Sequence, residues 1–207
     1  MSLVAPLVFI VDDDVGVRTA MQRVLRSVGL RSEAFATAQD FLQRKPYDGP
    51  SCLILDVRLP GISGLELQHK LIEAGLHIPV IFITAHGDIP MTVKAMKAGA
   101  VEFLTKPFRH QDLLDAIHQA LERDQVAQLQ QNEITELQRC FERLTTRERQ
   151  VMSLVISGMA TKEIASVLGT SEITAKVHRG QVMHKMKAKS PVELGRMAEK
   201  LKLPTIK

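Results

Sequence analysis

The stretch "VFIVDDDV", Val8 to Val15, joins four consecutive apolar residues to three consecutive aspartates. A short apolar run of this kind is typical of a buried β-strand. The end of such a strand is a costly place for Asp12, Asp13 and Asp14, because carboxylates that share a crevice repel one another unless a cation joins them. The stretch therefore predicts a strand that ends at a cation-binding site.

The composition is that of an ordinary globular protein. Of the residues, 45% are hydrophobic and 24% are charged. The length of 207 residues is enough for one large domain or two small ones. The two cysteines, Cys52 and Cys140, do not form a disulfide framework and are expected to be free thiols. No apolar run approaches the ~18 residues of a membrane span, and the N-terminus lacks signal-peptide features. We expect a cytoplasmic protein with no membrane partner.

Charge is shared unevenly along the chain. Residues 1–124 contain 13 Lys and Arg against 15 Asp and Glu, a net charge of −2, whereas residues 125–207 contain 14 against 8, a net charge of +6. This asymmetry indicates two different tasks, with the basic part a candidate for binding nucleic acid.

The first part of the chain alternates strand-like and helix-like segments. Short apolar segments are found at residues 7–12, 30–35, 52–57, 79–85 and 100–106. Helix-period segments follow them at residues 15–29, 37–45, 63–75, 89–99 and 109–124. This order predicts an α/β domain over residues 1–124, a doubly wound five-stranded parallel sheet covered on both faces.

The remaining chain is predicted to be helical. Residues 125–143 contain no Gly or Pro and are rich in Gln, Glu and Leu, which predicts a helical linker that continues the fifth helix. A dimerising coiled coil is the alternative. Residues 144–207 form a predicted all-α domain of four helices, at residues 144–158, 160–169, 170–187 and 190–202. Thr145 with Glu148, and Ser190 before Pro191, are helix-start signals.

The predicted strands carry polar residues at their carboxyl ends. These are Asp12, Asp13, Asp56, Thr84 and Lys106. Because the functional crevice of an open α/β sheet lies at these ends, the five side chains should converge. Three carboxylates suit Mg²⁺, and Asp56 could also attack phosphorus to form an acyl phosphate. Lys106 and Thr84 would then stabilise the phosphoryl oxygens. Asp14 is expected instead at a helix N-terminus.

These residues lie in motifs with a family resemblance. "VDDD", "LILDVRLPGISG", "ITAHGD" and "FLTKPF", in this order and spacing, resemble the receiver domain of bacterial two-component response regulators, over residues 6 to about 124. The resemblance implies a CheY-like fold. The longer run "VIFITAHGDIPMTVKAMKAGAVEFLTKPF", residues 80–108, resembles the FixJ branch of that family.

The resemblance implies a role for each matching residue. Asp56 is the expected phospho-acceptor from a sensor histidine kinase, with Mg²⁺ held by Asp12, Asp13, Asp56 and the backbone carbonyl of Arg58. Thr84 and Phe103 are the expected switch pair, Thr84 and Lys106 contact the phosphoryl group, and Lys106–Pro107 is an expected cis peptide. Arg58 and His86 occupy positions that tune phosphate lifetime. A homodimer is expected through a face that includes Val93, Lys97, Val101 and residues near Asp112.

The basic part resembles the LuxR/NarL/FixJ-type helix-turn-helix domain, over nearly all of residues 143–200. "TKEIASVLGTSEITAKVHR", residues 161–179, is two helices joined by a Gly-containing turn, and the second helix would enter the major groove. By this resemblance Lys176 and Val177 reach base edges, while His178, Arg179, Thr161 and Lys162 meet phosphates.

Other residues of the second helix have separate expectations. Most of Ile173, Val177, Val182 and Met186 are expected in the core, although Val177 could also touch bases. Lys185, Lys187 and Lys189 could add salt-sensitive attraction. Gly180 departs from the family pattern and either allows close backbone approach or makes no contact.

The combined expectation is a phosphorylation-controlled transcription factor that binds promoter DNA as a dimer, acts with RNA polymerase and activates transcription. One alternative is a phosphatase with an aspartate nucleophile, but Arg58 stands where its general acid would be. A second alternative is a receiver whose output is contact with proteins only. The basic second helix of the helix-turn-helix pattern disfavours it. A nucleotide-binding protein is a third, which lacks a glycine-rich loop after the first strand.

Overall fold

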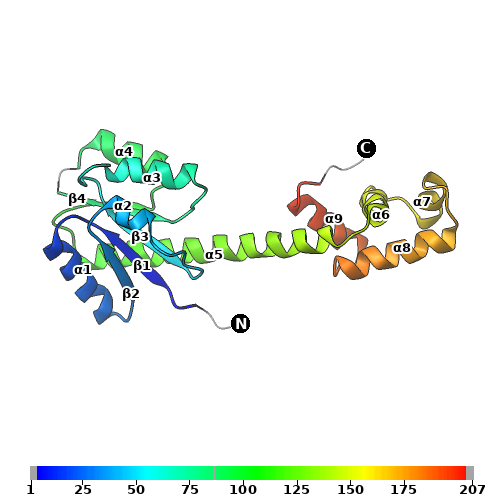
Figure 1. The fold of residues 1–207 in the computed structure, drawn as a ribbon, viewed down its shortest axis with the longest axis horizontal. Helices are drawn as coiled ribbons and strands as arrows, with labels where there is room; N and C mark the ends of the chain where they lie inside the picture. Colours follow the sequence, from blue (N-terminus) through cyan, green and yellow to red (C-terminus); the bar gives the residue numbers. More distant parts are fainter. Residues whose placement is uncertain (1–3, 86, 204–207) are drawn as a thin grey trace. The chain divides into compact units, whose positions relative to one another are not determined.

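The computed structural model describes residues 4–85 and 87–203. His86 and the last residues of the predicted DNA-binding domain, 204–207, lie outside this described part. The chain divides into two compact units, residues 1–128 and 129–207 (Figure 1).

The first unit contains a parallel five-stranded sheet with the strand order β2-β1-β3-β4-β5. Its strands are β1 (Leu7–Val11), β2 (Arg31–Phe35), β3 (Ser51–Asp56), β4 (Val80–Thr84) and β5 (Glu102–Thr105). Its helices are α1 (Val15–Ser27), α2 (Ala38–Leu42), α3 (Gly64–Glu73), α4 (Ile89–Lys97) and the first part of α5 (His110–Glu142). The predicted doubly wound α/β fold is confirmed.

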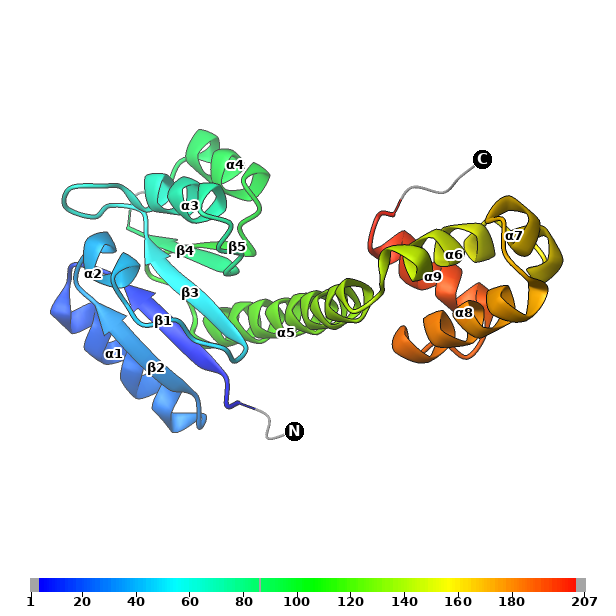
Figure 2. The ribbon, with the colours of Figure 1, turned by 45° about the vertical axis from the view of Figure 1, so that its right-hand side comes forward.

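Strand alternation creates two cores, one on each face of the sheet. Along β1, Leu7, Phe9 and Val11 pack on the face covered by α2, α3 and α4, and Val8 and Ile10 pack on the face covered by α1 and α5. Figure 2 shows these two helical layers on opposite sides of the strands. Because both faces of β1, β3 and β4 are buried, these strands read as continuous apolar runs.

Two residues determine where α1 and α3 begin after the strands that precede them. Asp14 caps α1, since its Oδ1 accepts hydrogen bonds from Gly16 N at 2.6 Å and Val17 N at 3.1 Å, which confirms its predicted place at a helix start. Gly64 begins α3 directly against the end of β3, where a Cβ atom would collide with the backbone carbonyl of Asp56. Only glycine therefore lets α3 start this close to the strand.

Over its described residues, 129–203, the second unit is all helical, as predicted. This part contains the end of α5 and four further helices, α6 (Thr146–Ile156), α7 (Thr161–Val167), α8 (Glu172–Lys185) and α9 (Pro191–Lys200). Thr145 and Glu148 form the predicted capping box, and Ser171 and Ser190 cap α8 and α9. Gly169, with φ +60°, makes the turn between α7 and α8.

The phase of α8 differs from the prediction. Ala175, Val182 and Met186 are buried, whereas Ile173 and Val177 are 79% and 57% exposed. At about 100° per residue, the three buried positions lie within about 40° of one another, and Ile173 and Val177 lie on the opposite side. The expected core placement of Ile173 and Val177 was therefore wrong.

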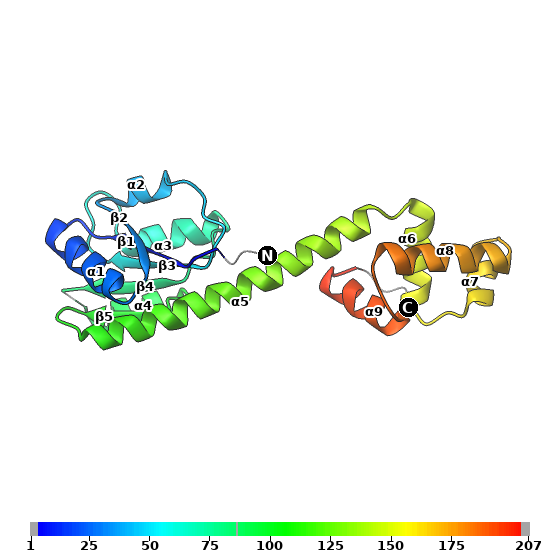
Figure 3. The same ribbon diagram turned by 90° about the horizontal axis from the view of Figure 1, so that it is seen from below.

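Helix α5 continues without a break to Glu142, so the segment predicted as a linker is helical up to that residue (Figure 3). Cys52 and Cys140 are both buried and unpaired. Within residues 4–85 and 87–203, no helix is both long enough and apolar enough to cross a membrane.

Candidate functional site

The carboxyl edge of the sheet brings the predicted acidic residues together. Asp12 follows β1, and Asp56 is the last residue of its neighbour β3. Carboxylate oxygens of Asp12, Asp13 and Asp56 all lie within 4.8 Å of one another. Asp12 is fully buried, Asp56 is buried and Asp13 is exposed, so the cluster opens to solvent on one side.

Lys106 follows β5 and supplies the positive charge for this cluster. Its Nζ lies 2.8 Å from Asp12 Oδ2 and 3.1 Å from Asp56 Oδ2. Burial raises the pKa of Asp12, and the hydrogen bonds from Lys106 and from Asp14 N only partly offset that effect. Burial alone would lower the pKa of Lys106, but its hydrogen bonds to the two carboxylates raise it. The ionised cluster thus depends on a neighbouring cation.

Backbone groups fix the orientation of the carboxylates. Asp14 N donates to Asp12 Oδ1 at 2.9 Å, and Arg58 N donates to Asp56 Oδ1 at 3.1 Å. Arg18 Nη1 donates to the backbone oxygens of Asp12 at 2.6 Å and Asp13 at 2.9 Å. Sequence reasoning missed Arg18, because its contacts are with backbone oxygens and no pattern of residue types indicates them.

Thr84 and Phe103 lie on adjacent strands near the cluster. Thr84 is the last residue of β4 and is fully buried, while Phe103 on β5 is partly buried with its ring 6.1 Å from that of Phe82. A backbone hydrogen bond of 2.7 Å from Lys106 N to Thr84 O joins the two strand ends. The predicted cis peptide between Lys106 and Pro107 is confirmed.

The face predicted for dimer contact needs one correction. Val101 is only 8% exposed and belongs to the core, because it directly precedes β5 and its N–H donates a hydrogen bond to Val80 O of β4. Exposed apolar side chains lie instead on α4. They are Ile89, Val93 and Met96, with 81%, 45% and 41% exposure, and they share one side of that helix.

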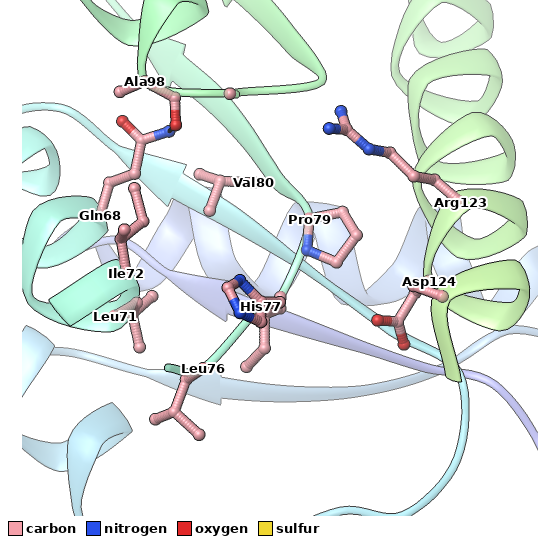
Figure 4. Close-up of a pocket in the computed structure, with 13 residues that line it drawn as sticks. Gln68, Leu71, Ile72, Leu76, His77, Pro79, Val80, Ala98, Arg123 and Asp124 are labelled. Atoms are coloured by element: carbon pink, nitrogen blue, oxygen red, sulfur yellow. Dashed lines mark hydrogen bonds between the residues drawn. The ribbon is translucent and has the colours of Figure 1, made fainter. Parts of the chain in front are cut away.

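A separate cavity of about 390 Å³ lies at the opposite edge of the sheet, beside the start of β4. Figure 4 shows Leu71 and Ile72 of α3 on one side, and Arg123 and Asp124 of α5 on the other. Asp124 Oδ2 accepts hydrogen bonds from Ser51 N at 2.7 Å and from Gln128 Nε2 at 2.8 Å. The hydrogen bond from Ser51 to Asp124 joins β3 to α5. None of these residues belongs to the acidic cluster, and Asp124 therefore takes no part in the candidate site.

The predicted DNA-contacting residues gather on and around α8. Lys176 and Val177 are exposed on α8, and Lys162 is exposed on α7. Arg179 Nη1 donates to Thr161 Oγ1 at 3.2 Å, which joins α8 to the start of α7.

Four other basic side chains of this unit were predicted to attract DNA, and they differ in exposure. His178 is partly exposed, and Lys187 and Lys189 are exposed. Lys185 Nζ is engaged 2.6 Å from Glu148 Oε2 and is not a free surface cation.

Comparison with known proteins gives the same division of the chain. Residues 8–118 match the family of the response regulator receiver domain, and residues 142–198 match the luxR family of bacterial regulatory proteins. Nodulation protein W of Bradyrhizobium diazoefficiens is 52% identical over 195 residues, which cover 94% of this chain and 86% of that protein. Transcriptional regulatory protein FixJ of Rhizobium meliloti is 41% identical over 191 residues, 92% of this chain and 94% of that protein.

Solved structures agree with the sequence relatives. The response regulator StyR, known at low resolution, is 47% identical and has a TM-score of 0.87, with 95% of this chain and 100% of that chain covered. The chain therefore belongs to the NarL/FixJ family of two-component response regulators, transcription regulators that join a receiver domain to a LuxR-type DNA-binding domain.

Proposed function

We propose that Asp56 accepts a phosphoryl group from a sensor histidine kinase, and that this modification promotes receiver dimerisation and sequence-specific binding of promoter DNA. The bound dimer would act with RNA polymerase to activate transcription. The observation that carries the proposal is the convergence of Asp56 with Asp12, Asp13 and Lys106 at one strand edge. The family to which the chain belongs supports the kinase and the DNA as partners.

The chemistry follows from the position of Asp56. Its carboxylate is 11% exposed, so an incoming phosphorus atom can reach it from the open side of the cluster. A bond between an Asp56 oxygen and phosphorus would form while the bond from phosphorus to the kinase imidazole breaks. Lys106 Nζ, 3.1 Å from Asp56 Oδ2, is placed to contact the phosphoryl oxygens, and the Thr84 hydroxyl is the second candidate.

The acidic cluster fits a bound Mg²⁺. Three carboxylates with oxygens within 4.8 Å of one another are hard oxygen ligands, and the fully buried Asp12 needs a compensating cation when it is ionised. Asp12, Asp13 and Asp56 would hold the ion, with the Arg58 carbonyl as a fourth protein ligand. When bound, Mg²⁺ offsets the negative charge of the carboxylates and of the phosphoryl oxygens.

Dimerisation would use the side of the receiver that contains α4. Ile89, Val93 and Met96 give that helix an exposed apolar stripe, which is costly in a monomer and is stabilised by a second copy. Thr84 and Phe103 are the proposed connection, because they lie on the two strands between Asp56 and this side of the sheet. A symmetric dimer would present two reading helices to two half-sites.

The test treats the full chain with acetyl phosphate and Mg²⁺, with the variant Asp56→Asn in parallel. Intact mass reports the phosphoryl group, and light scattering reports the molecular weight in solution. We expect one phosphoryl mass increment and a change from monomer to dimer in the wild type only. The same mass increment in Asp56→Asn would refute Asp56 as the acceptor. An increment in the wild type without a dimer would refute the dimerisation step alone.

A further inference from the structure

The outward side of α8 carries an apolar ridge that the core does not use. Ile173 and Val177 are one helical turn apart, on the side opposite the buried Ala175 and Val182, and are 79% and 57% exposed. Both are β-branched, so each holds its methyl groups in a nearly fixed position on the helix. The two side chains therefore present a preformed apolar surface to whatever lies against α8.

The next turn of the same side is bare. Gly180 follows Val177 on the outward side, and a Cβ atom built on it would meet nothing within 4 Å. His184 continues the outward side, and Lys176 lies at its edge. Within α8, which is described throughout, no carboxylate lies on this outward side, because the single acidic residue, Glu172, lies nearer the core side.

The surroundings identify the occupant of this ridge as DNA. The chain has a LuxR-type DNA-binding domain, residues 125–207 carry a net charge of +6, and the second helix of a helix-turn-helix lies in the major groove. Lys162, exposed on α7, and Arg179, whose side chain bonds Thr161 at the start of α7, supply positive charge in the same domain for contact with phosphates. In the major groove, the one apolar group on a base edge is the 5-methyl group of thymine.

We propose that Ile173 and Val177 read thymine 5-methyl groups, and that the bare Gly180 turn lets the helix backbone approach the base edges closely. This proposal rests on the proposed entry of α8 into the major groove. The two residues are about 6 Å apart along the helix, which corresponds to about two steps of 3.4 Å between base pairs. Each half-site should therefore contain two thymines within about two base-pair steps of each other.

The experiment first selects bound sequences from a random duplex library with the full chain, both untreated and treated with acetyl phosphate and Mg²⁺. The enriched duplex is then synthesised with single thymine-to-deoxyuridine replacements, which remove only the methyl group. In the wild type, we expect about four-fold weaker binding at each of two positions per half-site, the factor that corresponds to one lost methyl contact.

Variants assign each methyl contact to a side chain. Ile173→Ser should abolish the deoxyuridine effect at one position, and Val177→Ser at the other. Val167→Ser is the matched control, since Val167 on α7 is 60% exposed and lies outside the ridge, and it should retain both effects. Because all three side chains are exposed, circular dichroism should show unchanged folding.

The outcomes separate this inference from DNA binding itself. Enriched half-sites without thymine, or equal affinity for thymine and deoxyuridine, would overturn the ridge as a methyl reader and leave DNA binding intact. Retention of both effects in Ile173→Ser would remove Ile173 from the assignment. No enrichment in either condition would overturn the proposed DNA recognition together with this inference.

Discussion

Replacing Lys106 by Met removes the cation that joins two carboxylates in the receiver. Lys106 Nζ bonds Asp12 at 2.8 Å and Asp56 at 3.1 Å, and Asp12 has no exposed side-chain surface. Loss of one partner from a buried ion pair costs roughly 3–5 kcal/mol. The Lys106 side chain is 22% exposed and water screens part of this, so we expect a loss of about 2–4 kcal/mol.

The size of this loss should depend on Mg²⁺. Without the ion, the variant keeps two neighbouring carboxylates and no bonded side-chain cation, whereas added Mg²⁺ would restore a positive charge among them and reduce the loss. Urea denaturation of the full chain, followed by circular dichroism with and without Mg²⁺, measures both quantities. The exposed Lys45 is the control, and Lys45→Met should change stability by less than about 0.5 kcal/mol.

Two results would refute this reasoning. A Lys106→Met variant as stable as the wild type without Mg²⁺ would mean that the ion pairs contribute nothing net. An equal loss with and without Mg²⁺ would mean that the acidic cluster does not hold the ion, and the proposed metal ligands would have to be abandoned.

Three further predictions concern other parts of the chain. Asp124→Ala should lower the free energy of unfolding by about 1–3 kcal/mol, because it leaves the buried Ser51 N–H unpaired. Asp124→Asn can keep that hydrogen bond, so its free energy of unfolding in urea denaturation should equal or exceed that of the wild type. Hydrogen bonds from Lys185 and Thr145 N hold the pKa of Glu148 below its ordinary value of 4.5. These bonds therefore stabilise the folded state above pH 4.5, and the stabilisation is lost as the pH falls through the lowered pKa of Glu148. Thermal unfolding of Glu148→Gln should accordingly show a lower melting temperature at neutral pH and a weaker acid dependence; an unchanged pH profile would argue against the pair. Lys176→Ala should weaken binding of the enriched duplex and change base preference at one position, whereas a uniform loss across sequences would identify a phosphate contact instead.

The fold of the receiver could be predicted from the sequence because its central strands are buried on both faces. Continuous apolar runs such as residues 7–11 leave little doubt about a strand, and their carboxyl ends locate Asp12 and Asp56 at one edge. The contribution of Arg18 was not readable, because its side chain binds backbone carbonyls and no pattern of side-chain types records such a contact.

Periodicity failed where small residues make the core. In α8, the apolar spacing favoured Ile173 and Val177 as core residues, but the small Ala175 sets the buried side and leaves both exposed. Val101 was misplaced for a related reason. A residue directly before an edge strand can face either solvent or core, and the backbone hydrogen bond to Val80 that decides the position of Val101 is a tertiary contact.

The most direct test of the central claim is whether a phosphoryl group on Asp56 controls DNA binding by the other domain. Affinity for the enriched duplex should be measured for the full chain with and without Mg²⁺ and beryllofluoride, a stable phosphoryl mimic, with Asp56→Asn as the control. The account predicts about 5- to 150-fold tighter binding in the wild type, the usual range of coupling between two sites, and no change in Asp56→Asn. Equal affinity of the wild type in both conditions would contradict it.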